Sequence, residues 1–205
     1  MKKIISLSLI LLLGLIILTG CDNTKKNKGV EISYTHGKGT ITVTVPKDKE
    51  GNPKYQFTTE KPTGISVTKT FYLVTDSSMI GFSTSGMSYN TSIKYKEKYG
   101  DKKASFDGYL EFIEDKDLFN KSYLPGLEQF EINGRKAIRY YNRAGASGSY
   151  KYYGYFYMIG VDDIYPGSKL DLVVNYKGEE KPTEIKEFDE ETLEIIKSIK
   201  VIENK

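Results

Sequence analysis

Apolar and polar residues alternate over several short stretches of the chain, which is the pattern of β-strands with one buried face. The clearest stretch is 40–45, where Ile41, Val43 and Val45 would share one face of a strand. The residues just before it, His36-Gly37-Lys38-Gly39, predict a hairpin turn. Further strand-like runs are expected at 55–58, 65–74 and 79–83, with a turn-rich loop at 46–53 and a mobile Ser-, Thr- and Gly-rich connection at 83–90.

The second half of the chain predicts a meander of antiparallel strands. Asn133-Gly134 is the strongest short hairpin signal in the sequence, and it suits a type I′ turn. A second hairpin is expected around the Gly- and Ser-rich segment 144–149. The four strands expected in this half are 129–132, 135–142, 150–159 and 170–176.

Two helices interrupt and close this series of strands. Ser105 offers an N-cap for a short amphipathic helix over 106–118, where apolar residues recur at helical spacing. Asp189 offers an N-cap for a second helix, and Lys197 and Lys200 are expected in its last turn, where the helix dipole favours cations. This order of elements predicts an α+β fold, with a twisted, mainly antiparallel β-sheet flanked by helices.

The N-terminus has a different pattern, a mostly apolar run behind positive charge. Two lysines precede the apolar residues 4–18, and the run closes with Leu18-Thr19-Gly20-Cys21. This is a lipobox, the cleavage and lipidation signal of bacterial lipoproteins, so we expect cleavage between Gly20 and Cys21 and a diacylglyceryl thioether on Cys21. The run is shorter than the roughly 20 apolar residues of a transmembrane helix, and an uncleaved N-terminal anchor is the alternative.

The lipobox divides the chain into three parts. Residues 1–20 are expected to be a lipoprotein signal peptide, 21–29 a lipidated flexible tether and 30–205 a single domain. The tether is polar and lacks apolar periodicity. Two or three acyl chains on Cys21 would hold the protein stably at the extracytoplasmic face of the bacterial cell membrane, because a single chain holds only marginally.

Composition and charge exclude several classes of function. The formal charge of +3 falls to +1 when Lys2 and Lys3 leave with the signal peptide, and neither this charge nor export suits a nucleic-acid-binding protein. Cys21 is the only cysteine, so its lipidation leaves no disulfide and no thiol nucleophile. Zinc needs three or four Cys or His ligands, and His36 is the only histidine. We therefore expect no catalytic residues, no metal site and no cofactor.

The second half of the chain combines the hairpin segment 132–140, a long tyrosine-rich strand, Leu170-Asp171-Leu172-Val173-Val174 and the helical segment 191–200. This order of elements resembles the PsbP-like family, which includes many bacterial lipoproteins. The likeness extends more loosely to 41–46 and 106–112, and it is a pattern of hydrophobic residues and turns. The resemblance implies a central antiparallel sheet sandwiched by helices, an α/β/α arrangement. It also implies accessory or binding roles without a common active site.

Tyrosine is the one compositional anomaly, with 17 tyrosines and no tryptophan. Alternation puts Tyr153, Tyr155 and Tyr157 on one face of the expected strand and Phe156 and Met158 on the other, so this strand should be central in its sheet. The rings either form core under a helix or line a groove for a glycan, a peptide or a lipid.

All the arginines lie in one arm of the predicted hairpin, and alternation places Arg135, Arg139 and Arg143 on one face together with Tyr141. Such a row beside tyrosines suits a carboxylate or phosphate ligand, and ion pairing with the acidic segment 179–194 explains it equally well. The candidate ligand-binding residues are Arg135, Arg139, Tyr141, Tyr153 and Tyr155.

The sequence thus predicts a lipid-anchored, extracytoplasmic binding or assembly module of the bacterial cell envelope, without enzymatic activity. Besides the membrane, its partner would be an envelope protein, a glycan or a peptide. The alternatives are a hydrolase or hydrolase accessory directed at the cell wall, and a structural surface antigen. A cleft with two carboxyl groups a few ångströms apart would favour the enzyme, and an unbroken tyrosine-rich surface would favour binding.

Overall fold

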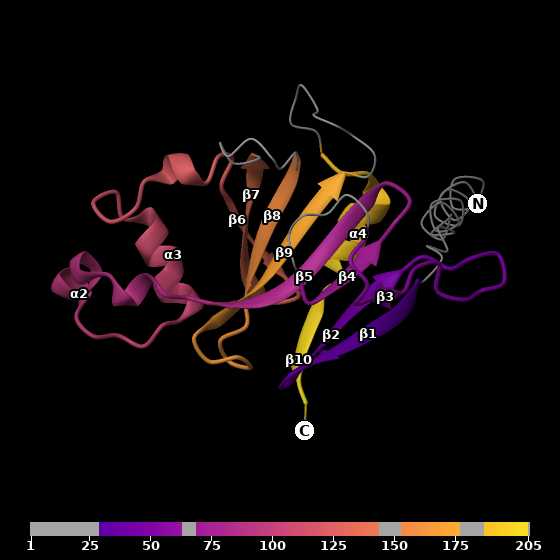
Figure 1. The fold of residues 1–205 in the computed structure, drawn as a ribbon, viewed down its shortest axis with the longest axis horizontal. Coiled ribbons are helices and arrows are strands. Elements are labelled where there is room, and N and C mark those ends of the chain that lie inside the picture. The colour runs from indigo at the N-terminus through magenta and orange to yellow at the C-terminus, as the bar shows by residue number, and fades with distance from the viewer. Residues whose placement is uncertain (1–28, 63–68, 144–152, 177–186, 205) are drawn as a thin grey trace, which may run out of the picture.

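Figure 1 shows the computed structural model of the chain, which describes residues 29–62, 69–143, 153–176 and 187–204. The expected signal peptide, Gly20, Cys21 and the tether up to residue 28 lie outside the described residues. The second hairpin turn at 144–149 and the first half of the acidic segment 179–194 also lie outside them. These expectations therefore stay predictions.

A three-stranded antiparallel sheet contains the first and the last strand of the described chain. Strand β2 (Gly39–Val45) lies between β1 (Val30–His36) and β10 (Lys200–Glu203). The hairpin predicted at 36–39 joins β1 to β2. The predicted alternation in β2 is also confirmed, because its apolar side chains are buried and its threonines are half-buried.

Strand β10 corrects the predicted end of the last helix. We expected Lys200 in the last helical turn, but helix α4 (Glu190–Lys197) ends earlier and Lys200 begins β10. The Lys200 ammonium group pairs with Glu31 on β1 and does not lie at the end of the helix. The following residue, Val201, is 5% exposed and belongs to the core. Burial of this side chain explains why the chain becomes a strand here.

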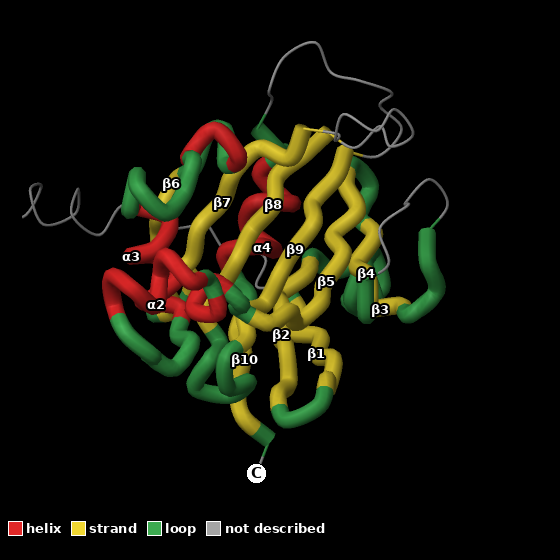
Figure 2. The backbone as a smooth tube through the Cα atoms, turned by 60° about the vertical axis from the view of Figure 1, so that its left-hand side comes forward, coloured by secondary structure: helices red, strands yellow, loops and turns green. Residues whose placement is uncertain are grey.

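A larger sheet of seven antiparallel strands forms the centre of the molecule (Figure 2). The predicted four-stranded meander is confirmed as four adjacent strands of it, from β6 (Glu128–Ile132) to β9 (Ser168–Tyr176). Strand β5 continues to Gly86, so the connection expected at 83–90 begins later than predicted. In spatial order the strands are β3 (Phe57–Thr58), β4 (Phe71–Val74), β5 (Ser78–Gly86), β9 (Ser168–Tyr176), β8 (Tyr153–Gly160), β7 (Arg135–Arg143) and β6 (Glu128–Ile132).

Both predicted helix starts are confirmed. The Ser105 hydroxyl accepts from Gly108 N at 3.1 Å at the start of α3 (Phe106–Glu114), and Asp189 Oδ1 accepts from Thr192 N at 2.9 Å at the start of α4. Helix α3 ends four residues before the predicted 118. Helix α2 (Ile93–Tyr99) was not predicted, because Tyr95 is its only buried residue and it has no apolar stripe. Short 3₁₀ turns lie at Tyr89–Thr91 and Lys121–Tyr123.

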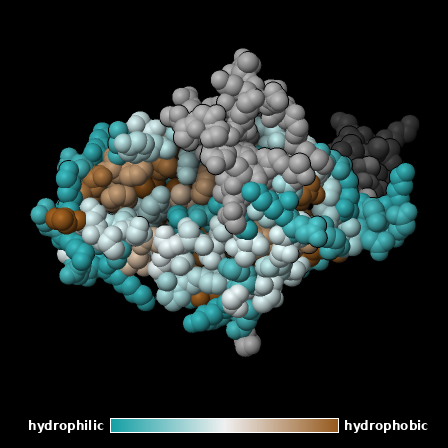
Figure 3. Space-filling view, viewed as in Figure 1, coloured by the Kyte–Doolittle hydropathy of each residue, from teal (hydrophilic) through white to brown (hydrophobic). Residues whose placement is uncertain are grey.

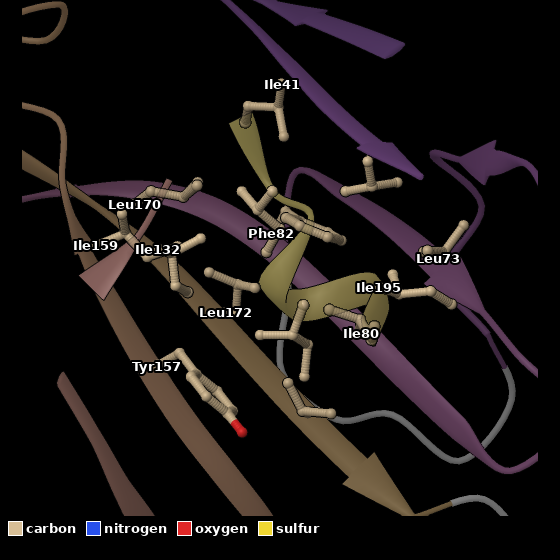
Figure 4. Packing of buried hydrophobic residues seen from close by; sticks show 14 of the residues in the cluster. Ile41, Leu73, Ile80, Phe82, Ile132, Tyr157, Ile159, Leu170, Leu172 and Ile195 are labelled. Atoms are coloured by element: carbon tan, nitrogen blue, oxygen red, sulfur yellow. The ribbon is translucent and has the colours of Figure 1, made fainter. Parts of the chain in front are cut away.

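The helices and the small sheet cover the two faces of the large sheet (Figures 1 and 2). Helix α4 and the three-stranded sheet pack on one face, where aliphatic side chains from both sheets meet (Figure 4). Helices α2 and α3 pack on the other face, on its β6–β7 side. The alternation predicted for β8 is confirmed, because Tyr155 and Tyr157 pack in the first core whereas Phe156 and Met158 pack in the second. The described chain is therefore an α+β fold with mainly antiparallel sheets and three helices.

The β6–β7 hairpin also fixes the end of α4. Asn133 and Gly134 both have positive φ, 47° and 77°, which is the signature of the predicted type I′ turn. The Asn133 side-chain amide donates to Lys197 O at 3.0 Å and to Ile199 O at 2.8 Å. These bonds satisfy carbonyl groups that the helix end leaves without an intrahelical partner. One residue thus shapes the turn and holds α4 against the large sheet.

An ion-paired aspartate joins α2 to the end of α3. Asp115 Oδ2 lies 2.7 Å from Lys98 Nζ and 2.7 Å from the Tyr99 hydroxyl, which donates to it. The Lys98 ammonium, followed by the Tyr99 hydroxyl, lowers the pKa of Asp115 from its ordinary 3.8 to about 2. A carboxyl group whose pKa is lower in the folded than in the unfolded state stabilises the fold above the unfolded value.

We therefore expect the stabilising effect of Asp115 to be complete at neutral pH and to be lost as the pH falls from about 4 to about 2. Urea unfolding of the parent protein and of Asp115→Asn across this pH range measures the effect. The parent should be more stable at neutral pH, and the difference should shrink as Asp115 becomes protonated. A difference that stays constant down to about pH 2 would contradict this assignment.

Candidate ligand-binding groove

A groove between β6 and α4 is the best candidate binding site among the described residues. Its volume is about 580 Å³, within the roughly 300–1,000 Å³ typical of small-ligand sites. The lining combines the apolar and aromatic side chains of Phe130, Tyr157, Leu193 and Ile196 with the charged side chains of Glu128, Glu131, Arg139, Glu187 and Lys197. Three carboxylates face two cations, so the lining has an excess of negative charge.

Arg139 is the best-anchored charge of this groove. Its Nε donates to Glu128 Oε2 at 2.9 Å, and its two terminal nitrogens pair with the two carboxylate oxygens of Glu187 at 2.9 and 2.8 Å. Its guanidinium carbon lies 4.8 Å from the centroid of the Tyr155 ring. The alternative of ion pairing with the acidic segment 179–194 is confirmed for this arginine, because Glu187 belongs to that segment. Arg139 thereby ties β6, β7 and the approach to α4 into one wall.

The candidate Tyr155 lies beneath this arginine, and the candidate Tyr141 packs against Tyr155. Tyr155 and Tyr141 are 7% and 5% exposed, and their ring centroids are 5.8 Å apart. The Tyr155 hydroxyl donates to Glu187 Oε1 at 3.2 Å. Burial, followed by the nearby Glu187 carboxylate, raises the pKa of Tyr155 to about 12, so this hydroxyl keeps its proton. Both rings support the groove from the core and do not form an open aromatic surface.

Tyr157 is the tyrosine that lines the groove. Its ring packs at 6.1 Å from Phe130, and in Figure 4 its hydroxyl oxygen points away from Leu172 and Ile159. This oxygen is buried and makes no well-formed hydrogen bond. Burial raises the pKa of Tyr157, although the adjacent Arg139 opposes the shift. Tyr157 therefore contributes its ring to the groove, while its buried hydroxyl lies beside Arg139.

Arg135 lies apart from this groove. Its two terminal nitrogens pair with both oxygens of Asp163 at 2.7 and 3.0 Å, and they also donate to Gly160 O and Val201 O at 3.0 and 3.1 Å. The guanidinium therefore connects β7 and the end of β8 to β10. Arg135 lines a separate depression of about 460 Å³. Of Tyr153 only the backbone is described, and it pairs with Arg143 across the hairpin.

Several groove residues were not among the sequence candidates. Phe130 lies in the predicted hairpin, whereas Leu193 and Ile196 lie in the predicted C-terminal helix. Their apolar character marked these elements as amphipathic, but it did not show that α4 lies beside β6. Glu187 was recognised only as part of an acidic segment. The groove is thus assembled by tertiary packing, from elements whose types the sequence does predict.

Two polar side chains outside the groove have structural partners. The only histidine, His36, lies 3.1 Å from the Thr84 hydroxyl, and Asp162 accepts from the backbone of Phe106 at 3.3 Å. Within the described ranges, no three or more His, Cys, Asp or Glu side chains form a group able to hold a metal ion.

None of the helices in the described part of the chain has both the length and the apolar character needed to cross a membrane. Comparisons of the chain with family models, with curated proteins and with solved structures found no match.

Proposed function

We propose that this protein is a non-enzymatic binding or assembly module of the bacterial cell envelope. In this proposal the diacylglyceryl group on Cys21 holds it at the extracytoplasmic face of the cell membrane, and the domain is a PsbP-like α/β/α sandwich. The observation that carries the binding role is the groove between β6 and α4, with apolar side chains beside fixed charges. The layered arrangement of helices around the large sheet supports the family assignment.

The groove suits an extended peptide segment of an envelope protein. Strand β6 is the outermost strand of the large sheet, and no described strand pairs with its outer edge, where an added strand could bind. Phe130 and Leu193 would receive an apolar side chain of this segment. The excess negative charge favours a basic residue beside it.

One observation keeps the alternative of a cell-wall hydrolase open. The carboxylates of Glu128 and Glu187 converge on the same guanidinium, and a glycoside hydrolase also uses two carboxyl groups. In such enzymes one group is a protonated acid and the other a carboxylate that faces the substrate. Here both groups bind Arg139, an arrangement that suits a binding wall better than acid–base chemistry. A structural surface antigen is the remaining alternative.

Co-purification from detergent-solubilised envelope tests the binding role. The full-length lipoprotein should be recovered in the membrane fraction together with a reproducible envelope protein. Leu193→Lys, which places a charge in the apolar part of the groove, should reduce recovery of that protein at least about tenfold.

Ile93→Lys is the matched control, because Ile93 is 76% exposed on α2 and lies outside the groove. It makes the same apolar-to-basic change and should leave recovery unchanged. Equal losses in the two variants, or no reproducible partner of the parent protein, would refute the groove as a docking site. Recovery of the parent in the soluble fraction would refute anchoring by lipid.

A further inference from the structure

A closed triad of polar side chains lies on the other face of the large sheet, opposite α4. Lys169 and Asp171 on β9 are only 8% and 5% exposed, and Lys169 Nζ lies 3.3 Å from Asp171 Oδ1. Ser85 is directly opposite Lys169 on β5, and its hydroxyl accepts from Lys169 Nζ at 2.6 Å and donates to Asp171 Oδ2. Within this triad the positive charge of Lys169 and the negative charge of Asp171 cancel.

A second lysine, Lys69, lies beside the triad and has no ion-pair partner among the described residues. Lys69 Nζ lies 3.3 Å from the hydroxyl of Ser83, the residue opposite Asp171 on β5, and 5.2 Å from the centroid of the Phe156 ring. No carboxylate of the described ranges forms an ion pair with Lys69. Burial lowers the pKa of Lys69, while Asp171 opposes this shift and Lys169 adds to it. A desolvated ammonium group without a counter-ion is unfavourable, and a bound anion would relieve that cost.

Aromatic side chains form a platform next to Lys69. The rings of Phe156 and Tyr140 stack with centroids 5.3 Å apart and 19° between their planes. Tyr109, from α3, lies at the edge of the same cluster, and all three rings are partly exposed. Burial, followed by the Asp171 charge, raises the pKa of Tyr109 to about 12, and burial also raises that of Tyr140. Both hydroxyls keep their protons, and neither bonds to another described residue, so both are available as donors.

This side of the sheet is only partly covered. In Figure 2, α2 and α3 lie toward β6 and β7, and none of the described helices lies over β9 and β5 on that face. Figure 3 shows apolar residues gathered at the end of the molecule that α2 and α3 form. Phe156 and Tyr140 pack against the second core. One part of this sheet face is covered by the described helices and another part is not. The boundary between the two parts contains Lys69, the two tyrosine hydroxyls and the aromatic platform.

We propose that this lysine cluster, made up of Lys69, Ser83, Tyr109, Tyr140 and Phe156, binds a small carboxylate ligand that has a planar ring. Lys69 pairs with the carboxylate, the tyrosine hydroxyls donate hydrogen bonds to it, and the ring lies along Tyr140 and Phe156. The Asp171 carboxylate lies near the same side chains, and its ion pair with Lys169 and its bond to Ser85 reduce its repulsion of the anion. The cluster lies on the opposite face of the sheet from the groove, so it is a second, independent site.

Ligand titration of the full-length lipoprotein in detergent micelles tests this site. The probes are benzoate, neutral benzyl alcohol and cationic benzylamine, which share one ring and differ in charge. Benzoate should shift the NMR signals of the Tyr140 ring and of the Lys69 side chain in a saturable way, and it should bind at least about tenfold more tightly than benzyl alcohol. Equal binding of the alcohol, preference for the amine, or no saturable shift would overturn the proposal.

Variants of Lys69 test whether its charge is responsible for benzoate binding. The aliphatic stem of Lys69 packs over Gly81, where an added Cβ would lie 2.8 Å from Lys69 Cγ, so Lys69→Met keeps the packing and removes the charge. Lys69→Met should weaken benzoate binding at least about tenfold, whereas Lys69→Arg should retain it. Lys102→Met is the matched control, because exposed Lys102 also lies over an aromatic ring, 5.3 Å from the Tyr99 centroid. A similar loss in Lys102→Met would overturn the assignment, and the groove variant Leu193→Lys should bind benzoate normally.

Discussion

Replacement of Gly154 by alanine is expected to lower the free energy of unfolding by about 3 kcal/mol or more, or to prevent folding. A Cβ atom at this position of β8 would lie 1.8 Å from Val174 O and 3.0 Å from the Asn175 Cα, both on the neighbouring strand β9. These are backbone atoms in the middle of the large sheet, and no side-chain rotation removes the overlap. Urea unfolding followed by far-UV circular dichroism measures the loss.

Gly86→Ala provides the control for this experiment. Gly86 also lies in a strand of the large sheet, at the end of β5, but an added Cβ there has no atom within 4 Å. The substitution should change the free energy of unfolding by less than about 1 kcal/mol, and in the stabilising direction, because alanine has less freedom in the unfolded chain. Comparable losses in the two variants would show that the close approach of β8 to β9 is not the cause.

The second large effect is expected at β10. Val201→Asp should lower the free energy of unfolding by about 3 kcal/mol or more, because it puts a carboxylate at a position that is 5% exposed between the small sheet and the core. Its neighbour Ile202 is 58% exposed on the opposite face of the same strand. Ile202→Asp should therefore change stability by no more than about 0.5 kcal/mol.

This pair of variants also tests the strand itself. A helix or an irregular tail at 200–203 would not separate the two neighbours in this way, since strand alternation is what places them on opposite faces. Equal effects of Val201→Asp and Ile202→Asp in urea unfolding would contradict the pairing of β10 with β2. The same measurement thus serves as a check on the topology of the small sheet.

The parts of the fold that were predicted correctly depend on interactions between residues close in sequence. The Asn133-Gly134 turn needs only two residues with positive φ. The caps at Ser105 and Asp189 each bond to a backbone group three residues later. Apolar and polar residues alternate in β2 because one face of this strand is buried. Both faces of β8 carry apolar residues because both are buried.

The parts that were not predicted depend on contacts between distant residues. Helix α2 buries little besides Tyr95 and has no apolar stripe, so it carries no periodic signal. Lys200 continues the helical pattern of α4 in the sequence. It begins a strand because it pairs with β2, which is distant in sequence. The groove needs β6, Glu187 and α4 side by side. Among the candidate residues, Arg139 lines it, Tyr141 and Tyr155 support it from below, and Arg135 serves another contact.

The position of β10 beside β2 has a consequence for the order in which the chain folds. The hairpin β1–β2 leaves the ribosome early, but the strand that completes its sheet is made only after nearly all other elements. Until then, one edge of β2 has unpaired backbone groups and its apolar face lacks Val201. Contacts between such distant segments form slowly, so the newly made protein passes through a period in which this edge is open to other chains. Chaperones that act on it during this period would be expected to recognise the β1–β2 hairpin.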